Sequence, residues 1–134
     1  MKKVEHIGIA VKDIEKSNKI FSKIFGIKSC KSEIVDSEGV ITSFFRVGSH
    51  KIELVAPINK QGPIQKYLEN NSEGIHHIAF DVEDIHKEMK RISACGIRLL
   101  SDKPKIGADN KLICFLHPKD TNGVLIEICQ EISS

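Results

Sequence analysis

The chain has 134 residues, 40% of them hydrophobic and 28% charged, and its formal net charge is +2. This composition is typical of one globular domain large enough to bury its own core. Lysine and arginine are scattered along the chain, which argues against nucleic acid as a partner. No run approaches the roughly 20 apolar residues of a membrane span, and none at the start is long enough for a signal peptide. We therefore expect no membrane or nucleic-acid partner.

The cysteines predict a reducing environment. The four cysteines are Cys30, Cys95, Cys114 and Cys129. They are far apart in the sequence and form no C-x-x-C pair, and three of them interrupt or flank apolar runs. Cysteines of this kind usually act as small hydrophobic side chains in reduced proteins. We expect a cytoplasmic location.

The first half of the chain predicts the element order β-α-β-β-β. Residues 3–11 alternate and are rich in Val and Ile, as in a strand. Asp13 stands where a helix N-cap belongs, and Gly26 stops the helix that follows. Three further strands are predicted, the last two as a hairpin: 27–36, 40–47 and 50–55.

The second half repeats this order after a short helix, 64–70, and a polar linker, 71–74. We expect a single domain, 1–134, with module 1 at about 1–60, a linker helix at 61–74 and module 2 at about 75–134. The predicted elements of module 2 are a strand at 75–82, a helix from Asp84 to about Ala94 closed by Gly96, a strand at 97–100, a loop at 104–110, and strands at 111–117 and 124–129.

The two halves also share a sequence repeat. At an offset of 71 residues, the chain aligns His6 with His77, Val11 with Val82, and Asp13 with Asp84. Later in each half, residues 51–54 match residues 125–128, which aligns Glu53 with Glu127. A histidine therefore opens each half and a glutamate closes it.

The repeated residues predict a metal site. Strand alternation puts His6 on one face with Gly8 and Ala10, and His77 on one face with Ala79, so small side chains leave room for a ligand. A carboxylate between apolar strand residues is costly to bury without a partner. Taken singly, each residue would be structural or solvated, but four residues matched through a repeat favour a divalent first-row ion. The expected ligands are His6, Glu53, His77 and Glu127.

Two other histidines need separate interpretation. His76 precedes His77 but points to the opposite face of the strand, and its repeat partner is Glu5, so we interpret it as a non-ligand. His117 precedes Pro118 at a strand end, where it either lines the pocket or has only a structural role.

These motifs resemble the vicinal oxygen chelate (glyoxalase) superfamily and, within it, the methylmalonyl-CoA epimerases. The resemblance covers nearly the whole chain, and the His-Pro-Lys segment and the double histidine are its most specific parts. The segments that carry it are 6–11, 62–64, 74–80, 104–108, 115–120 and 123–127. It implies an α+β fold in which two βαβββ modules in tandem form a curved mixed sheet around a metal site.

The resemblance also implies a reaction. Methylmalonyl-CoA would be epimerised between 2R and 2S by proton abstraction at C2 through a metal-stabilised enolate. His6, His77 and Glu127 would bind Co, Mn, Ni or Zn, and position 53, a Gln in some epimerases, would supply the fourth ligand. Glu127 would be one acid/base, and the second would be Glu53, Glu38 or a water on the metal. Thr42 stands where some epimerases carry a glutamate proposed for that role.

The expected substrate is an acyl-CoA. Lys105 and Lys119 are candidates for its phosphates, and His117 is a candidate pocket residue. The resemblance further implies a homodimer. The alternative enzyme is a lactoylglutathione lyase acting on the methylglyoxal–glutathione hemithioacetal, which Glu53 fits slightly better than Gln. A second alternative is a non-catalytic module that binds a small molecule, and metal content separates it from both enzymes.

Overall fold

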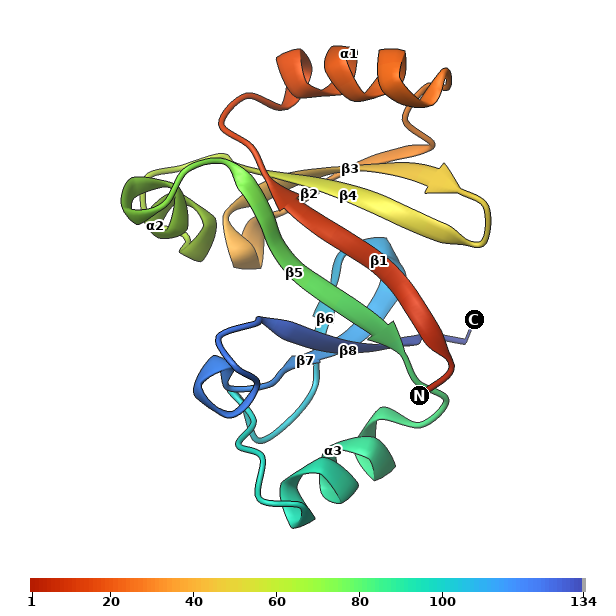
Figure 1. Ribbon diagram of the computed structural model, residues 1–134, viewed down its shortest axis with the longest axis vertical. Coiled ribbons are helices and arrows are strands. Elements are labelled where there is room, and N and C mark those ends of the chain that lie inside the picture. Colours follow the sequence, from red (N-terminus) through yellow and green to blue (C-terminus); the bar gives the residue numbers. More distant parts are fainter. Residues whose placement is uncertain (134) are drawn as a thin grey trace. The chain divides into compact units, whose positions relative to one another are not determined.

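The computed structural model describes residues 1–133 and contains two successive βαβββ arrangements with a helix between them (Figure 1). The first consists of β1 (Lys3–Ala10), α1 (Ile14–Phe25), β2 (Lys31–Val35), β3 (Val40–Val47) and β4 (His50–Pro57). Helix α2 (Pro63–Asn70) follows. The second consists of β5 (Gly74–Asp81), α3 (Ile85–Ala94), β6 (Lys105–Gly107), β7 (Lys111–Phe115) and β8 (Ile126–Glu131). Three short 3₁₀ turns lie at Asp36–Glu38, Ala108–Asn110 and Pro118–Asp120.

The strands hydrogen-bond in the order β2-β3-β4-β1-β5-β8-β7-β6. The sheet is mixed, because β5 and β8 run parallel whereas β2–β3, β3–β4, β6–β7 and β7–β8 are antiparallel pairs. Helices and a mixed sheet make this an α+β fold, as the sequence predicted. Among residues 1–133, no helix has the length and apolar character needed to cross a membrane.

The chain divides into two compact units that do not follow the halves of the sequence. The 7–76 unit contains the second half of β1 together with α1, β2, β3, β4 and α2. The 77–133 unit contains α3, β6, β7, β8 and most of β5, and it also includes Met1–His6. Strand β1 therefore begins in one unit and ends in the other, which brings His6 into the same unit as the second half of the chain.

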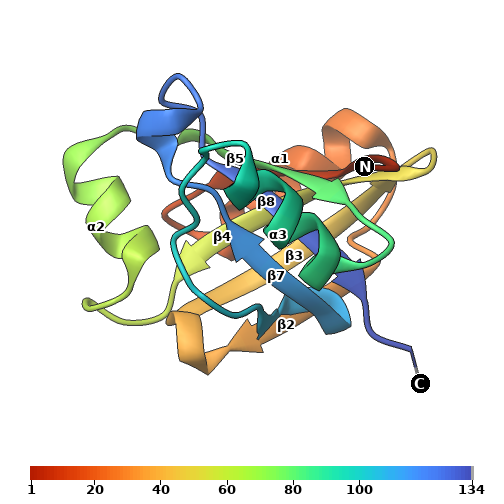
Figure 2. The ribbon, with the colours of Figure 1, turned by 90° about the horizontal axis from the view of Figure 1, so that it is seen from below.

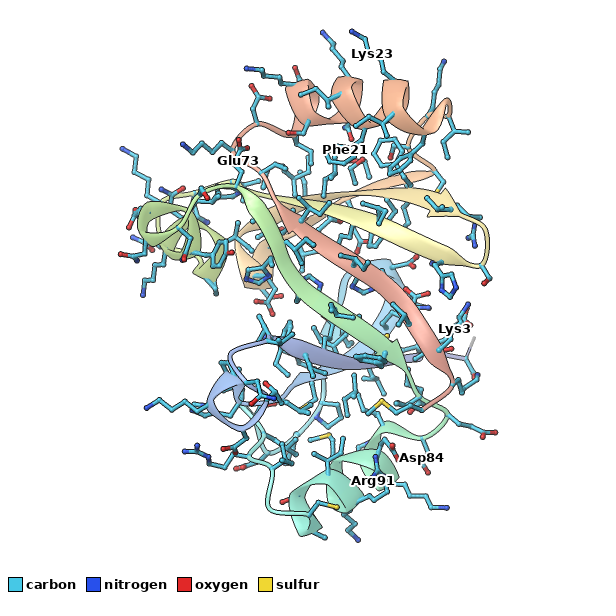
Figure 3. The ribbon with its side chains drawn as sticks, viewed as in Figure 1. Lys3, Phe21, Lys23, Glu73, Asp84 and Arg91 are labelled. Carbon is cyan, nitrogen blue, oxygen red and sulfur yellow. The ribbon has the colours of Figure 1, made fainter. Side chains whose placement is uncertain are left out.

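In the 7–76 unit, local sequence signals fix both ends of α1. Asp13 is the N-cap, and its carboxylate accepts a backbone hydrogen bond of 3.1 Å from the first turn. Gly26 ends the helix at φ 69°, a conformation that glycine adopts without steric cost. Phe21 lies on the side of α1 that faces the strands, where it packs on the core cluster containing Leu54, whereas Lys23 points away from them (Figure 3).

In the 77–133 unit, α3 repeats this construction. The carboxylate of Asp84, its N-cap, accepts a backbone hydrogen bond of 3.1 Å from the first turn. Gly96, at φ 88°, follows the last turn. Figure 2 shows α3 in front of β7 and β8, and the buried Met89 and Ile92 pack there with Ile128. This core cluster fixes β8 against α3.

Two predicted elements are wrong. Residues 97–100 form no strand, only a single bridge between Leu99 and Leu116, because the Arg98 backbone N–H bonds to the Asp120 carboxylate at 2.8 Å. The predicted loop 104–110 contains strand β6, which pairs with β7. Gly107 permits that pairing, because a Cβ there would lie 2.7 Å from the side chain of Ile113. The strand predicted at 27–36 is also shorter than expected, since β2 spans only Lys31–Val35.

Candidate metal centre

Three of the four predicted ligands converge in the 77–133 unit. The Nε2 atoms of His6 and His77 lie 3.1 Å apart. The Glu127 carboxylate lies 3.8 Å from His6 Nε2, through Oε2, and 3.6 Å from His77 Nε2, through Oε1. One donor atom from each residue fits within a group whose members are all less than 4.8 Å apart. Each of the three residues is only 5% exposed.

Strand register explains how His77 and Glu127 meet. Glu127 on β8 lies opposite Ala79 on β5 and opposite Phe115 on β7. His77 shares its strand face with Ala79, two residues further along β5, so His77 and Glu127 project from the same face. Ala79 itself is fully buried in a core cluster with Ile113 and Cys129. The ring of Phe115 stands edge-on to His77 with centroids 6.0 Å apart, which supports the orientation of the imidazole.

The donor distances fit a divalent metal ion. Metal bonds of about 2.1 Å place neighbouring donor atoms about 3.0 Å apart at right angles and about 3.4 Å apart at the tetrahedral angle. The two nitrogens, 3.1 Å apart, match these values, and the two Glu127 oxygens, one facing each histidine, lie slightly above them at 3.6 and 3.8 Å. Two imidazoles and one carboxylate are also a donor set that first-row divalent ions prefer. Residues His6, His77 and Glu127 therefore fit such an ion at adjacent coordination positions.

The electrostatic surroundings favour a cation. Cys129 is buried on β8, and its thiol pKa is raised, mainly by burial and then by the negative charges of Glu127, Glu5 and Asp81. The same carboxylates act on any charge placed near them. A bound cation would offset part of the free-energy cost of burying Glu127 and Glu5, which are each 5% exposed.

Glu5 was not predicted from the sequence. Its carboxylate Oε1 lies 3.0 Å from His6 Nδ1, and both side chains are buried. Strand alternation assigns neighbouring residues to opposite faces, so the two side chains were not expected to meet. A signal was present nevertheless: a charged residue stands inside an apolar strand, where an unpaired carboxylate is costly.

The fourth predicted ligand, Glu53, belongs to the 7–76 unit. It is 5% exposed on β4, opposite Phe44 on β3. Its role as a ligand or acid/base stays a prediction. Thr42, which the resemblance placed at the position of a catalytic glutamate, is 2% exposed, and its hydroxyl donates to the Glu33 carbonyl at 3.4 Å. Glu38 is half-buried in the first 3₁₀ turn.

The His-Pro-Lys segment forms an ordered turn in the 77–133 unit. His117 Nδ1 accepts a hydrogen bond of 3.2 Å from the backbone N–H of Lys119, so the histidine caps the turn that it begins. The Arg98 guanidinium donates to both oxygens of Asp120 at 2.9 Å, which holds the pKa of that carboxyl well below its usual range. His117 is half-buried, and Lys119 and Lys105 are exposed. Solvent-facing lysines are compatible with phosphate binding.

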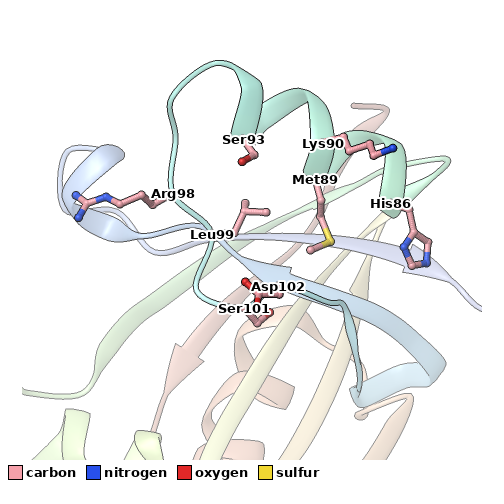
Figure 4. A pocket seen from close by; sticks show the side chains of 8 residues that line it. All are labelled: His86, Met89, Lys90, Ser93, Arg98, Leu99, Ser101 and Asp102. Carbon is pink, nitrogen blue, oxygen red and sulfur yellow. The ribbon is translucent and has the colours of Figure 1, made fainter.

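A separate cavity of about 490 Å³ lies between α3 and residues 98–102 (Figure 4). Met89 and Leu99 form its apolar part, while Lys90, Ser93 and Asp102 are among its polar lining. None of the predicted site residues lines it. We therefore do not assign the candidate metal centre to this cavity.

Comparison with known proteins defines the class. A family model of the Glyoxalase/Bleomycin resistance protein/Dioxygenase superfamily matches residues 5–115, and the chain belongs to this superfamily. Its fold is the α+β fold of the vicinal oxygen chelate proteins, as the sequence predicted.

Within the superfamily, the chain is similar to methylmalonyl-CoA epimerases. An ethylmalonyl-CoA/methylmalonyl-CoA epimerase of Cereibacter sphaeroides is 39% identical over 96% of this chain and 97% of its own length. The mitochondrial methylmalonyl-CoA epimerase of Dictyostelium discoideum is 39% identical over 94% of this chain and 76% of its own. A variant of Streptomyces coelicolor methylmalonyl-CoA epimerase, solved in complex with 2-nitronate-propionyl-CoA, has a TM-score of 0.95 at 30% identity and covers 99% of both chains. The resemblance predicted from the sequence is confirmed.

Lactoylglutathione lyases are more distant. The protein of rice, Oryza sativa subsp. japonica, is 22% identical over 96% of this chain and 43% of its own length. The chain is therefore more similar to the epimerases than to this lyase.

Proposed function

We propose that this protein is a metal-dependent methylmalonyl-CoA epimerase. The observation that carries the proposal is the convergence of His6, His77 and Glu127, whose donor atoms lie 3.1 to 3.8 Å apart in a chain 39% identical to an epimerase over nearly its full length. The reaction is inversion at C2 of the methylmalonyl group. It proceeds by removal of the C2 proton from one face and delivery of a proton to the opposite face by a second group.

A divalent ion held by the three residues would supply Lewis-acid stabilisation of the negative charge that develops as the C2 proton leaves. Glu127 is the proposed first acid/base: its Oε2 faces His6 and its Oε1 faces His77, so one oxygen would bind the ion while the other takes the proton. Its burial excludes water, which strengthens the electrostatic interactions at the site. His6 and His77 would bind the ion and fix its position, and they transfer no proton in this scheme.

Inversion needs a second proton carrier, because a single carboxylate serves only one face of the planar intermediate. Glu53 is the first candidate, because the repeat equates it with Glu127 and it is equally buried. Glu38 is the second, and a water molecule is the third. Thr42 is not a candidate, because a neutral aliphatic hydroxyl is a poor general base.

The phosphates of the acyl-CoA substrate would bind to exposed basic residues. Lys105 and Lys119 are exposed and carry the charge that phosphate groups require. His117, held by its own turn, is proposed to line the pocket. A homodimer and a cytoplasmic location are part of the same proposal, as is the choice of ion among cobalt, manganese, nickel and zinc.

The test is reconstitution with a substrate comparison. The purified protein is treated with chelator, reloaded with Co²⁺, Mn²⁺, Ni²⁺ or Zn²⁺, and assayed on methylmalonyl-CoA and on the methylglyoxal–glutathione hemithioacetal. We expect metal-dependent turnover of methylmalonyl-CoA at least about a hundredfold faster than of the hemithioacetal, a ratio equivalent to about 2.7 kcal/mol. The reverse ratio would indicate a lyase, and failure to bind any metal would indicate a non-catalytic binding module.

A further inference from the structure

The contact between Glu5 and His6 has a consequence for metal binding. Glu5 Oε1 and His6 Nδ1 are 3.0 Å apart, a normal hydrogen-bond distance, and the side chains of both residues are only 6% exposed. Glu5 is neither one of the predicted ligands nor one of the proposed acid/base residues. A buried carboxylate that takes part in no chemistry requires another explanation for its position.

The hydrogen bond fixes which nitrogen of His6 carries the proton. An ionised carboxylate only accepts hydrogen bonds, so the hydrogen between the two groups must belong to Nδ1. In the neutral imidazole, Nε2 then carries the lone pair. That Nε2 is the atom that lies 3.1 Å from His77 Nε2 and 3.8 Å from Glu127 Oε2. The contact therefore selects the tautomer that can bind a metal at the place where the three donors meet.

The same contact restricts the His6 ring. Glu5 contacts the Nδ1 side of the ring. On the other side, the His6 ring packs edge-to-face against the His77 ring, with centroids 5.2 Å apart. Rotation about the Cβ–ring bond would break the buried charge-assisted hydrogen bond. A carboxylate hydrogen-bonded to a metal-binding histidine also raises the basicity of the ligand nitrogen.

The repeat indicates that this arrangement is specific to His6. The residue that aligns with Glu5 at the offset of 71 is His76, so His77 is preceded by an imidazole instead of a carboxylate. The His76 ring packs edge-on against Tyr67, with centroids 4.9 Å apart. Only one of the two repeated histidines has an acidic residue immediately before it.

We propose that Glu5 is a positioning residue for metal binding, which fixes the tautomer and ring orientation of His6. The inference rests on the proposed metal-dependent function but concerns a residue outside the ligand set. Loss of an outer partner of this kind typically weakens metal affinity about 10- to 100-fold.

The first experiment measures metal affinity by titration calorimetry with Co²⁺ and Zn²⁺. The variants are Glu5→Gln, which keeps the shape and one acceptor oxygen, and Glu5→Leu, which removes every acceptor. Glu131→Gln is the matched control, because Glu131 is an exposed residue at the end of β8 and its substitution removes the same charge. We expect Kd to rise about 10-fold in Glu5→Gln, about 100-fold in Glu5→Leu and less than about 2-fold in Glu131→Gln.

The second experiment uses the unaltered protein, so it holds even if a variant fails to fold. Long-range ¹H–¹⁵N NMR of the Zn²⁺-loaded protein reports which His6 nitrogen carries a proton. We expect a protonated Nδ1 with its proton shifted downfield by the carboxylate, and Nε2 bound to zinc. In Glu5→Leu the Nδ1 proton should lose that shift, which a merely structural role for Glu5 would not predict.

The outcomes separate the two proposals. If the unaltered protein binds neither ion, the proposed function and this inference both fail. If it binds tightly and both Glu5 variants bind equally well, or if zinc is bound through Nδ1, Glu5 has no positioning role and the metal-dependent function still stands. Weaker binding in the Glu5 variants alone, together with the expected His6 tautomer, supports the inference.

Discussion

The two repeated histidines occupy equivalent positions in the sequence but have different neighbours in the structure. His6 is preceded by the buried Glu5, whose carboxylate lies 3.0 Å from its Nδ1. His77 is preceded by the half-buried His76, whose ring packs on Tyr67. The two Nε2 atoms nevertheless lie 3.1 Å apart. The repeat thus preserves the two imidazoles, whereas the residue that precedes each one differs between the halves.

The two repeated glutamates show the same contrast. Glu127 and Glu53 are each 5% exposed on strands of similar sequence. Glu127 lies within 3.8 Å of both histidines in the 77–133 unit. Glu53 belongs to the 7–76 unit, where it lies opposite Phe44. Equivalence in sequence therefore predicts burial at both positions, and the structure shows it at both. Paired substitutions test how far the equivalence extends.

The largest effect is expected at the histidines. His6→Ala and His77→Ala each remove one nitrogen donor, so each should abolish tight metal binding and lower kcat/KM by more than about 10³-fold. Metal content after dialysis and the rate of epimerisation are the measurements. The ligand roles predict equal losses for the two variants. A variant that keeps full metal content and activity would remove its histidine from the site.

The next effect concerns the glutamates. Glu127→Gln removes the proposed acid/base but keeps a donor oxygen, so kcat should fall by about 10²-fold or more while the metal is retained with weaker affinity. Glu53→Gln should cost less, because the resemblance places a glutamine at this position in some epimerases. The measurements are the steady-state kinetics and the metal content of both variants. Full activity in Glu127→Gln would show that this carboxylate carries no proton.

A third pair compares the cores behind these strands. Leu54 and Ile128 follow Glu53 and Glu127, are both 0% exposed, and belong to different core clusters. Replacing either with Ala leaves a cavity and should lower the free energy of unfolding by about 2–5 kcal/mol. Urea unfolding of the metal-free protein measures the change. A loss below about 1 kcal/mol at either position would indicate that its unit relaxes around the cavity.

The smallest effect is expected at the helix N-caps. The carboxylates of Asp13 and Asp84 each accept a hydrogen bond of 3.1 Å from the first turn of their helix. Asp13→Ala and Asp84→Ala should each lower the free energy of unfolding by about 1 kcal/mol. Thermal unfolding of the two variants should show similar shifts. Markedly unequal shifts would mean that one helix depends on its cap more than the other.

Much of the fold could be predicted because its signals are local. Residues 3–11 alternate over a full strand, and Asp13 and Gly26 mark both ends of the first helix. Strand β6 was missed because three residues are too few to show a period of two. The strand predicted at 97–100 was wrong for another reason. The Arg98 backbone N–H donates its hydrogen bond to the carboxylate of Asp120, which is more than 20 residues away in the sequence. A distant competitor for a backbone hydrogen bond leaves no trace in the local pattern.

The site was predictable to the extent that the repeat contains it. His6, His77 and Glu127 were found because each matches a residue in the other half, and the structure brings all three together. Glu5 was not found, because periodicity describes which way a side chain leaves the strand and not where a long side chain ends. The repeat also predicts a ligand role for Glu53, and that stays a prediction.

The most direct test of the central claim is proton NMR of (2S)-methylmalonyl-CoA in deuterated water. The spectra are compared for metal-loaded protein, chelator-treated protein and the loaded His77→Ala variant. We predict that only the loaded, unaltered protein exchanges the C2 proton for deuterium and generates the 2R epimer. Exchange at the same rate without metal, or in the variant, would contradict a metal centre built from His6, His77 and Glu127. No exchange in any sample would contradict the epimerase.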